Sequence, residues 1–542
     1  MMNQKLVWIL WLILIVNGTV VQAAAADADS GSAMPRTIEN EDYYRLQQEL
    51  LNQQNHQEKS AVVDHTTQQE TAAPDSTLAF PVTQIEIDAS EILAPAEIGA
   101  ITGQYEGRIV GIQELYQALR EINELYAKKG FITAKAILPP QKISGGVVRI
   151  KLVEGHFGQF LLEGNKSTRS SYILERLSPQ SGDLVNLNTL SQDIFYFNRT
   201  NDIQLKAELK PGREFGLTDC ILRVEEPGNA QATFFSDNGG AVSTGEYRLG
   251  ASLVINSLFR VRDSLTVSPV WTQGTWSGSL AYSRPLDKRG TRLGISYSKN
   301  QSSVISGAFQ SLDIKSNETD IGLNLSHPLR VKPNFKADAY GGVTHKRAET
   351  DFSAATLIDY DVNALSLGVS FQTIAPNGFW YSRSDLTWGL PENGAAFGRL
   401  NLSAVRQRLL ANDRLLIYRI AGQLSDGHLL PSTETFGIGG MTTVRGYPAS
   451  QYSGDQGYNL SIEYNFPVSF SKKMKGIFFI DHGGVFPFKG NDDTRGDFLT
   501  SVGFGANLNF SNHLSGKVTI GFPIRPPDGQ GVRIDYFMQL GI

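Results

Sequence analysis

Cysteine is nearly absent from this chain of 542 residues. Cys220 is the only one, so no disulfide can form within the chain. A polypeptide of this length without cross-links must be held together by core packing or by a membrane. Glycine and aromatic residues are plentiful instead, with 53 glycines and 10% aromatics, and without long apolar runs this composition points to β structure.

Long apolar runs are missing after the first few residues. The one such run, residues 6–16, follows Lys5 and precedes a small-x-small cleavage pattern at residues 21–23. We interpret residues 1–23 as an export signal peptide, because the run is shorter than the about 20 residues that a membrane-spanning helix needs. No later segment reaches that length without polar residues, so the sequence predicts an exported chain without a helical anchor.

A strong excess of charge is also missing, because the formal net charge is only −5. Nucleic-acid binders usually carry a basic patch and a high isoelectric point, so the sequence predicts no nucleic-acid partner. The motifs G-x-x-x-x-G-K-[ST], G-x-S-x-G and H-E-x-x-H do not occur, and the eight histidines are scattered. We therefore expect no ATP binding, no enzymatic activity, no metal site and no cofactor.

The segment after the signal peptide, residues 24–59, is polar and rich in Gln, Asn and Glu. Residues 37–59 can form one helix with a thin apolar stripe at Tyr43, Leu46 and Leu50. We expect this helix to dock on another part of the protein; a disordered tether with transient helicity is the alternative. Residues 60–80 have the composition of a flexible linker.

Two α/β segments follow. In residues 81–154 we expect the order strand, helix, helix, strand, strand, with "ELYQALREINELYAKKG" as the clearest helix. Its apolar residues recur at helical spacing: Leu115, Leu119, Ile122 and Tyr126. Gly130 closes this helix as a C-terminal cap. Residues 155–227 repeat the plan more loosely.

Period-two alternation replaces helical periodicity in residues 228–542. In "NLSIEYNF" one face carries Leu460, Ile462, Tyr464 and Phe466, and the other carries Asn459, Ser461, Glu463 and Asn465. Strands of about ten residues with aromatics near their ends are typical of a transmembrane barrel, whereas a soluble sandwich has strands of about five or six. At roughly 20 residues per strand and connection, the region provides about 16 antiparallel strands. The predicted fold class is therefore α+β modules followed by an all-β membrane domain, a 16-stranded transmembrane β-barrel.

The loop between the eleventh and twelfth predicted strands, residues 425–456, contains "GGMTTVRGYPAS" with Arg445 near its centre. It is the sixth external loop if the chain starts inside. On the thirteenth strand, Asp481 shares an inward face with Phe479 and Gly483. An inward carboxylate flanked by apolar residues needs a cation, which the loop could deliver as Arg445. The alternatives are a solvated loop arginine that touches lipopolysaccharide phosphates, and an ordinary polar lumen aspartate.

These residues carry a family resemblance. The motif Val444-Arg445-Gly446-Tyr447 resembles the VRGY motif in the sixth loop of two-partner secretion transporters. The N-terminal part resembles the same family through "YEG", "LYAKKGFITAKAILPPQ" and "VRIKLVEG" in the first α/β segment. The resemblance covers essentially the whole mature chain.

The wall of the predicted barrel shows the second motif of this family. Phe479-x-Asp481-x-Gly483 resembles its F-x-D-x-G motif on strand thirteen. The resemblance implies that Arg445 pairs with Asp481 in the lumen. One departure is that many outer-membrane barrels end in an aromatic residue that the assembly machinery reads, whereas this chain ends in Ile542.

The resemblance also implies an architecture. Residues 24–59 would hold a plug helix and residues 60–80 a linker. Residues 81–154 and 155–227 would be two POTRA (polypeptide-transport-associated) domains in the periplasm. Residues 228–542 would form the barrel in the outer membrane of a Gram-negative bacterium, surrounded by lipid and lipopolysaccharide and inserted by the barrel assembly machinery.

The implied function is two-partner secretion. The POTRA domains would bind a large exoprotein through its N-terminal secretion domain, and the barrel would translocate it unfolded to the cell surface without ATP. The alternative within the superfamily is an outer-membrane protein insertase, which usually carries more POTRA domains. A passive porin is a third possibility, although porins lack POTRA-like domains.

Overall fold

The structure is a computed structural model of the chain, and it describes residues 62–64, 78–353, 355–469, 471–486, 496–524 and 531–542. The predicted signal peptide, residues 1–23, and the predicted plug helix, residues 37–59, lie outside the described residues. The chain divides into two compact units, which are described separately. One is Gln57–Pro227, and the other contains Gly228–Ile542.

The first α/β module is built around helix α4 (Ile112–Lys128). All four apolar residues that predicted this helix are buried: Leu115, Leu119, Ile122 and Tyr126. The Glu114 side chain accepts a hydrogen bond from the Gly111 amide at 2.8 Å and so caps the N-terminus. Gly130 follows the helix with φ +88°, a conformation that suits glycine and stops the helix as predicted.

Two small sheets pack with this helix. The strands of the module are β2 (Ala79–Val82), β3 (Gln84–Ile87), β4 (Arg108–Gly111), β5 (Lys135–Ile137) and β6 (Val147–Val153). In the order β3-β6-β5, β3 is parallel to β6 and β5 is antiparallel to it, while β2 and β4 form an antiparallel pair. With the shorter helix α3 (Pro95–Thr102), these strands enclose one hydrophobic core.

The second α/β module has the predicted order of strand, helix, helix, strand, strand. Its elements are β7 (His156–Glu163), α5 (Ser170–Leu174), α6 (Leu187–Thr200), β8 (Gln204–Pro211) and β9 (Leu217–Glu225). The Asn186 side chain caps α6 by accepting hydrogen bonds from the backbone amides of its first turn. Cys220 lies in the core on β9, where burial raises the pKa of its thiol to about 12. Within the described residues, we find no helix that is both long and apolar enough to cross a membrane.

The prediction of a flexible linker over residues 60–80 is wrong in two places. Strand β1 (Val62–Asp64) pairs in parallel with β8, opposite Ala207, Glu208 and Leu209. Ala79 and Phe80 already belong to β2. The sheet of the second module therefore has the order β1-β8-β9-β7. Two adjacent valines suit an extended conformation, and they satisfy an otherwise open sheet edge.

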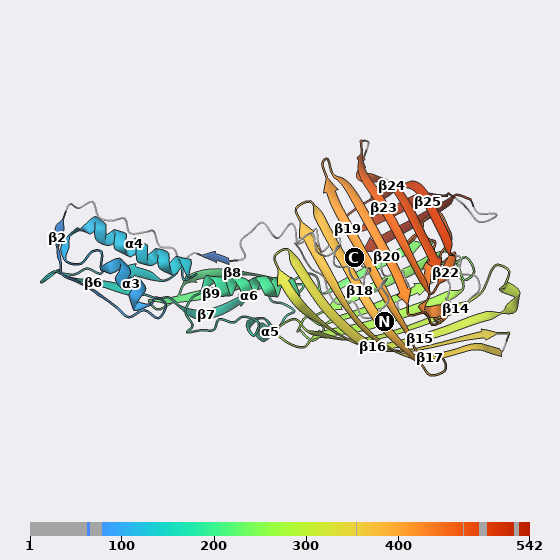
Figure 1. The fold of residues 1–542 in the computed structure, drawn as a ribbon, viewed down its shortest axis with the longest axis horizontal. Coiled ribbons are helices and arrows are strands. Elements are labelled where there is room, and N and C mark those ends of the chain that lie inside the picture. The colour runs from blue at the N-terminus through green and yellow to red at the C-terminus, as the bar shows by residue number, and fades with distance from the viewer. Residues whose placement is uncertain (1–61, 65–77, 354, 470, 487–495, 525–530) are drawn as a thin grey trace. The chain divides into compact units, whose positions relative to one another are not determined.

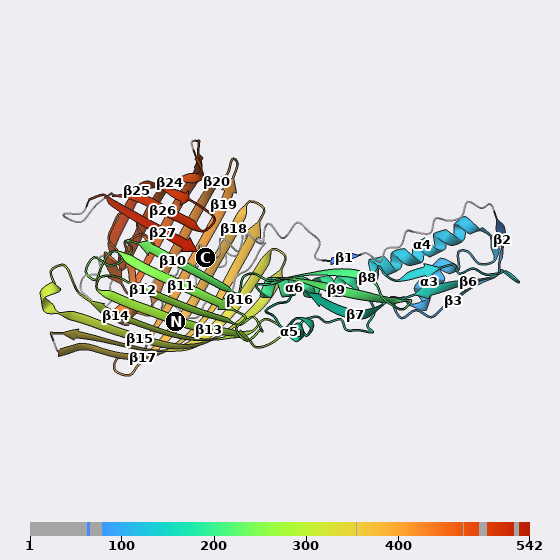
Figure 2. The same cartoon turned by 180° about the vertical axis from the view of Figure 1, so that it is seen from behind.

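The second unit is a closed antiparallel barrel of sixteen strands, as predicted (Figures 1 and 2). Its strands are β10 (Ala230–Asp237), β11 (Arg248–Asn256), β12 (Ser264–Trp271), β13 (Thr275–Pro285), β14 (Arg292–Ser303), β15 (Ile314–Lys332), β16 (Phe335–Phe352), β17 (Ala355–Ala375), β18 (Gly378–Pro391), β19 (Phe397–Leu410), β20 (Arg414–Ser425), β23 (Gln456–Val468), β24 (Ser471–Phe486), β25 (Asp497–Asn509), β26 (Leu514–Pro523) and β27 (Arg533–Gly541). Strand β27 closes the barrel against β10, and Figure 2 shows the two side by side. Closure leaves no unpaired edge for lipid to contact.

The strands alternate between an apolar outer face and a mostly polar inner face. On β24, Phe478 and Ile480 are each 55% exposed on the outside, whereas Phe479 and Asp481 are at most 3% exposed on the inside. This is the pattern of a membrane barrel, in which the exposed apolar face contacts lipid. The alternation seen in the sequence therefore determines which side chains can meet in the lumen.

Three strands are about twice as long as the predicted ten residues. Strands β15, β16 and β17 have 19, 18 and 21 residues. About 9–11 tilted residues suffice to cross the hydrocarbon core, so the remainder extends beyond it. The extension carries exposed charged pairs such as Arg347 and Glu349, which lie 2.6 Å apart. Because backbone pairing continues past the membrane, apolar alternation alone underestimates the length of these hairpins.

Glu154, at the end of the first module, ties three segments together. Its carboxylate accepts hydrogen bonds from the Ser90 hydroxyl, from the Tyr126 hydroxyl at 2.7 Å and from the Glu91 amide at 2.8 Å. Burial acts to raise the pKa of Glu154, but these hydrogen bonds outweigh it, and the pKa lies below its ordinary value. The charged form is therefore favoured by the folded state.

We predict that Glu154→Gln destabilises the first module by about 1–2 kcal/mol at pH 7, because an amide nitrogen would face the Glu91 amide and the charge is lost. Since the folded pKa is depressed, this contribution is complete above the unfolded pKa of about 4.3 and disappears as pH falls through the folded value. Urea unfolding of the Gln57–Pro227 fragment at pH 7 and pH 3 measures it. Glu124→Gln, on the exposed face of α4, is the control. Equal stability of wild type and Glu154→Gln at pH 7 would contradict the prediction.

Candidate functional site

The loop between β20 and β23, called loop 6 here, is the predicted eleventh-to-twelfth connection of the barrel. It contains a 3-10 turn, η2 (Ser432–Glu434), and two short strands, β21 (Phe436–Ile438) and β22 (Tyr452–Gly454). The two strands pair with each other in antiparallel register. Loop 6 is therefore a folded hairpin, and its tip is the glycine-rich stretch that contains Arg445.

Glycines shape the tip of loop 6. Gly439, Gly440 and Gly446 have φ values of +107°, +94° and +92°, which side-chain-bearing residues rarely adopt. The turn is closed by a hydrogen bond from the Gly440 amide to the Tyr447 carbonyl at 3.0 Å. The Thr443 hydroxyl bonds both the amide and the carbonyl of Gly439 at 2.9 Å. These hydrogen bonds hold the tip in one conformation.

Apolar packing anchors the residues beside the arginine. Val444 and Tyr447 are fully buried, and they belong to one cluster with Phe436, Ile438, Val485 and Leu499. The Tyr447 hydroxyl donates to the Thr500 carbonyl on β25 at 2.9 Å. Loop 6 is therefore packed against the barrel wall at β24 and β25.

Two wall glycines allow this close approach. A Cβ atom on Gly483 would lie 3.1 Å from the Val444 side chain, and one on Gly521 would lie 2.5 Å from the Gly446 amide nitrogen. Gly483 is the last residue of the F-x-D-x-G motif, so its role is to leave room for the neighbour of Arg445. The absence of side chains at Gly483 and Gly521 of the wall therefore lets Val444 and Gly446 of the loop lie directly against it.

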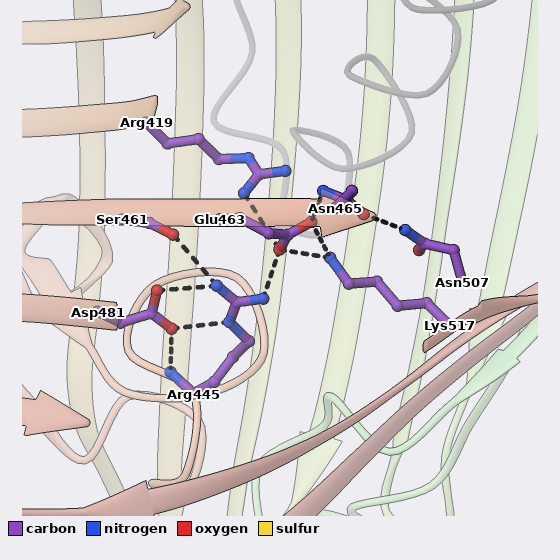
Figure 3. Close-up of polar contacts among 8 residues, drawn as sticks. All are labelled: Arg419, Arg445, Ser461, Glu463, Asn465, Asp481, Asn507 and Lys517. Atoms are coloured by element: carbon purple, nitrogen blue, oxygen red, sulfur yellow. Dashed lines mark hydrogen bonds and ion pairs between the residues drawn. The ribbon is translucent and has the colours of Figure 1, made fainter. Parts of the chain in front are cut away.

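Arg445 forms a bidentate ion pair with Asp481 (Figure 3). Its Nε donates to Asp481 Oδ2 at 2.7 Å and its Nη2 donates to Oδ1 at 2.9 Å. The Arg445 backbone amide also donates to Oδ2 at 3.1 Å. Asp481 is 0% and Arg445 4% exposed. The two predicted site residues therefore meet in the parallel geometry that only a guanidinium provides.

Phe479 contributes the remaining part of the wall motif. Its ring centroid lies 3.6 Å from Arg445 Cζ, a cation–π contact. A Cβ atom on Gly503 of β25 would lie 2.2 Å from this ring, so that position leaves space for the phenylalanine. In the wall motif, Phe479 thus stacks on the guanidinium of Arg445 and Asp481 forms its ion pair. Gly483 leaves room for Val444 at the tip of loop 6.

A second carboxylate, Glu463 on β23, also binds the arginine. Arg445 Nη1 donates to Glu463 Oε2 at 2.6 Å, and Nη2 donates to the Ser461 hydroxyl at 3.2 Å. Lys517 Nζ lies 2.8 Å from Glu463, and Arg419 Nη1 lies 3.6 Å from it. The prediction of a single acid partner is therefore incomplete. Glu463 could have been suspected, because it is the only acid on the polar face of "NLSIEYNF".

The two acids depend on Arg445 to different degrees. Among the ion pairs of the described residues, Asp481 has Arg445 as its cation, whereas Glu463 has Lys517 and Arg419 as well. Withdrawal of the loop would leave Asp481 without a positive partner but would leave Glu463 paired. The electrostatic cost of opening the site therefore falls mainly on Asp481.

Other side chains near the site have structural partners. His482 lies on the outer face of β24 and is hydrogen-bonded to the hydroxyls of Tyr458 at 3.0 Å and Thr500 at 2.8 Å. In the part of the chain that the structure describes, no group of three or more His, Cys, Asp or Glu residues could hold a metal ion. The arrangement binds a protein loop through charge and shape.

We predict that Gly521→Ala displaces the tip of loop 6, because the new methyl group would collide with the backbone of Gly446. In a Cys220→Ser background, a Val444→Cys reporter buried in the closed site should react with a polar thiol reagent at least roughly ten times faster in this variant. Gly541→Ala, where a Cβ meets nothing within 4 Å, is the control. An unchanged labelling rate in Gly521→Ala would show that the close approach is not needed.

Comparison with known proteins gives two family matches. The haemolysin secretion/activation protein family ShlB/FhaC/HecB matches residues 216–508, and the ShlB-type POTRA domain matches residues 80–155. The heme/hemopexin transporter protein HuxB of Haemophilus influenzae (strain 86-028NP) is 25% identical over 480 residues, which cover 83% of this chain and 84% of the relative. The outer membrane transporter CdiB of Dickeya dadantii (strain 3937) is 25% identical over 534 residues, covering 92% and 93%. The hemolysin transporter protein ShlB of Serratia marcescens is 24% identical over 479 residues, covering 82% of each.

Solved structures share the fold. CdiB from Escherichia coli superimposes with a TM-score of 0.63 at 21% identity, covering 95% of this chain and 100% of that one. BamA from Haemophilus ducreyi lacking POTRA domains 1–3 gives 0.56 at 14% identity, covering 86% and 100%. The family match spans more than half of the chain, and the sixteen-stranded barrel with its N-terminal POTRA domain agrees with it. The protein is therefore an outer-membrane transporter of the ShlB/FhaC/HecB haemolysin secretion/activation family, a two-partner secretion protein whose POTRA region faces the periplasm.

Proposed function

We propose that this transporter carries one large exported partner protein, unfolded and without ATP, from the periplasm to the cell surface. The observation that carries the proposal is the buried, bidentate contact between Arg445 and Asp481, which holds loop 6 against the inside wall of the barrel. Such a contact gives the pore a defined closed state. A passive channel would not need an electrostatic lock on a folded loop.

The proposed partner is an exoprotein with an N-terminal secretion domain. Support comes from the relatives, which are named as transporters for hemolysin and for heme/hemopexin. In this proposal the second α/β module, residues 155–227, is a second POTRA domain that acts with the first. The outward apolar face would contact outer-membrane lipid and lipopolysaccharide, and the barrel assembly machinery would insert the barrel.

Capture of the partner would use β-augmentation, in which an extended segment adds to a sheet edge through main-chain hydrogen bonds. The second module supports this idea, because the edge of β8 accepts β1 as an added parallel strand. Main-chain pairing requires little sequence in the added segment. The same chemistry would let one periplasmic module accept successive segments of a long unfolded partner.

Energy for transport would come from the partner. The chain has no P-loop motif, and the proposal includes no chemical step and no cofactor. Folding of the partner outside the cell would make its movement one-way. The polar inner face of the barrel would let an unfolded segment pass without binding tightly.

The proposed gate is the withdrawal of loop 6. Removing one partner of a buried ion pair costs about 3–5 kcal/mol in a dry interior, and water in the lumen should reduce this value. Each 1.4 kcal/mol corresponds to a factor of about ten in population, so even a reduced cost keeps the closed state dominant. The partner would have to supply this free energy.

We predict that Arg445→Ala impairs secretion more than barrel assembly, because the loop loses its closed position while the strands keep their backbone pairing. Arg445→Lys should be nearly as defective, since an ammonium cannot form two parallel hydrogen bonds with Asp481. Secretion is measured as partner protein in the medium, and assembly as the heat-modifiable band of the folded barrel on gels. Secretion by Arg445→Ala at the wild-type rate would show that the ion pair is not part of the gate.

We also predict that co-expression with a large exported protein encoded beside this gene releases that protein into the medium. Removal of residues 81–227 should abolish release while the barrel still assembles. The insertase alternative, suggested by the shared fold with BamA, makes a different prediction. It requires that depletion of this protein lowers the amounts of unrelated outer-membrane barrels, and that outcome together with no release would refute the secretion proposal.

A further inference from the structure

We propose that loop 6 has a second latch of opposite polarity, in which Lys346 of the wall exchanges between Glu434 of the loop and Asp320 of the wall as the gate opens. This inference rests on the proposed gating role of loop 6. It concerns a different part of the loop from the Arg445 site. Its evidence is a buried carboxylate, two wall cations and a wall acid that is incompletely paired.

Glu434 ends the 3-10 turn η2 on the limb of loop 6 that leads from β20 into the lumen. It is 2% exposed. Its Oε1 lies 2.5 Å from Lys346 Nζ on β16, and its Oε2 lies 2.8 Å from Arg399 Nη2 on β19. The side-chain amide nitrogen of Gln423 also donates to the backbone carbonyl of Glu434 at 2.8 Å. Both oxygens of this deeply buried carboxylate lie beside cations of the wall; Oε1 is hydrogen-bonded to Lys346, whereas Oε2 has only the charge of Arg399 beside it and no hydrogen-bond partner among the described residues.

Leu430 fixes the same limb by apolar contact. It is 4% exposed and packs with Val362, Ala364 and Phe397, from β17 and β19. Its amide donates to Asp455 Oδ1 at 2.9 Å, which joins the two limbs of the loop. Glu434 therefore sits on a limb that is already seated against the wall, so its two ion pairs can act as a latch.

The charges at the Glu434 contact are arranged in the opposite way to those at the Arg445 contact. There the loop supplies the cation, Arg445, and the wall supplies the acids; here the loop supplies the acid, Glu434, and the wall supplies the cations. The two contacts are made with different strands, β23 and β24 at the tip and β16 and β19 at the limb. A competitor that takes the loop's place on the wall must supply a cation at the tip and an anion at the limb. No single competing charge would therefore release both the tip and the limb of the loop.

Asp320 is the proposed second acceptor for Lys346. It lies directly opposite Lys346 in the register of β15 and β16, within the reach of a lysine side chain. Asp320 is 2% exposed; its Oδ2 accepts from the Ser298 hydroxyl at 3.5 Å, and its Oδ1 has no hydrogen-bond partner among the described residues. A buried carboxylate oxygen without a donor is costly, so Asp320 favours any state in which Lys346 turns toward it.

The exchange lowers the cost of lifting the limb. When Glu434 leaves for water, Lys346 gains Asp320, and Arg399 keeps its contact with the Gln423 side-chain oxygen at 3.3 Å. No wall charge is left without a polar partner. The limb latch is therefore easy to release and reform, in contrast to the tip, where Asp481 is left without its cation.

The test measures the fraction of time that the purified full-length protein conducts in planar lipid bilayers at pH 8. Glu434→Gln should raise this fraction roughly tenfold or more, the scale expected for losing hydrogen bonds to a charged group. Asp320→Asn should lower it, because Lys346 then loses the charged acceptor directly opposite it that replaces Glu434 in the proposed exchange. The decrease is measured in an Arg445→Ala background, where opening is frequent enough to quantify. In a Lys346→Met background, Asp320→Asn should change nothing.

The matched control is Glu349→Gln, on the same strand as Lys346 but paired with Arg347 outside the lumen. Heat-modifiability of each variant shows that its barrel has folded. The opposite signs of Glu434→Gln and Asp320→Asn distinguish an exchange from a general loss of stability. Equal or same-direction effects of the two variants would overturn the inference.

Arg445→Ala separates this inference from the gating proposal on which it rests. An increase in conductance for Arg445→Ala, without the opposite effects of Glu434→Gln and Asp320→Asn, would refute the second latch alone. No change in conductance for any of the variants would refute the gating role of loop 6 itself.

Discussion

A guanidinium held between two carboxylates inside a closed barrel is the interaction on which the functional part of this structure depends. Arg445 uses its planar fork on Asp481 and its remaining donors on Glu463 and Ser461. Such a group is stable at this depth only because almost every donor and acceptor is matched. The packing of Val444 and Tyr447, and the glycines that let them approach the wall, serve to bring this side chain to that place.

Closure of the barrel is the condition for that match. The acids come from β23 and β24, and Lys517 comes from β26, so their relative positions depend on the register of successive strands. The same register places Asp320 opposite Lys346 on another sector of the wall. Loop 6 is thus held at its tip and at its limb by charges of opposite sign. In the proposed gate, two unlike anchors would resist opening by any single competing ion and would yield to a partner that displaces both.

Much of this architecture can be predicted from the sequence, because the spacing of apolar residues along the chain differs between helices and strands. The spacing of Leu115, Leu119, Ile122 and Tyr126 predicts α4, and period-two alternation predicts sixteen strands and the inward face of Asp481. The prediction was wrong where a segment's conformation depends on a distant edge, as in β1, which is ordered by pairing with β8. It was too short for β15 to β17, because backbone pairing continues where apolar alternation has ended.

The sequence by itself determined which side chains face inward, where the turns and the long loop fall, and that one arginine and one aspartate carry family motifs. Only the tertiary structure decided that Glu463 shares the arginine with Asp481 and that Glu434 of the same loop binds Lys346 and Arg399. The physical reason is that alternation reports the face of each residue on its own strand. Distances across a lumen depend on how all the strands are staggered when the sheet closes, and no local pattern of residues encodes that stagger.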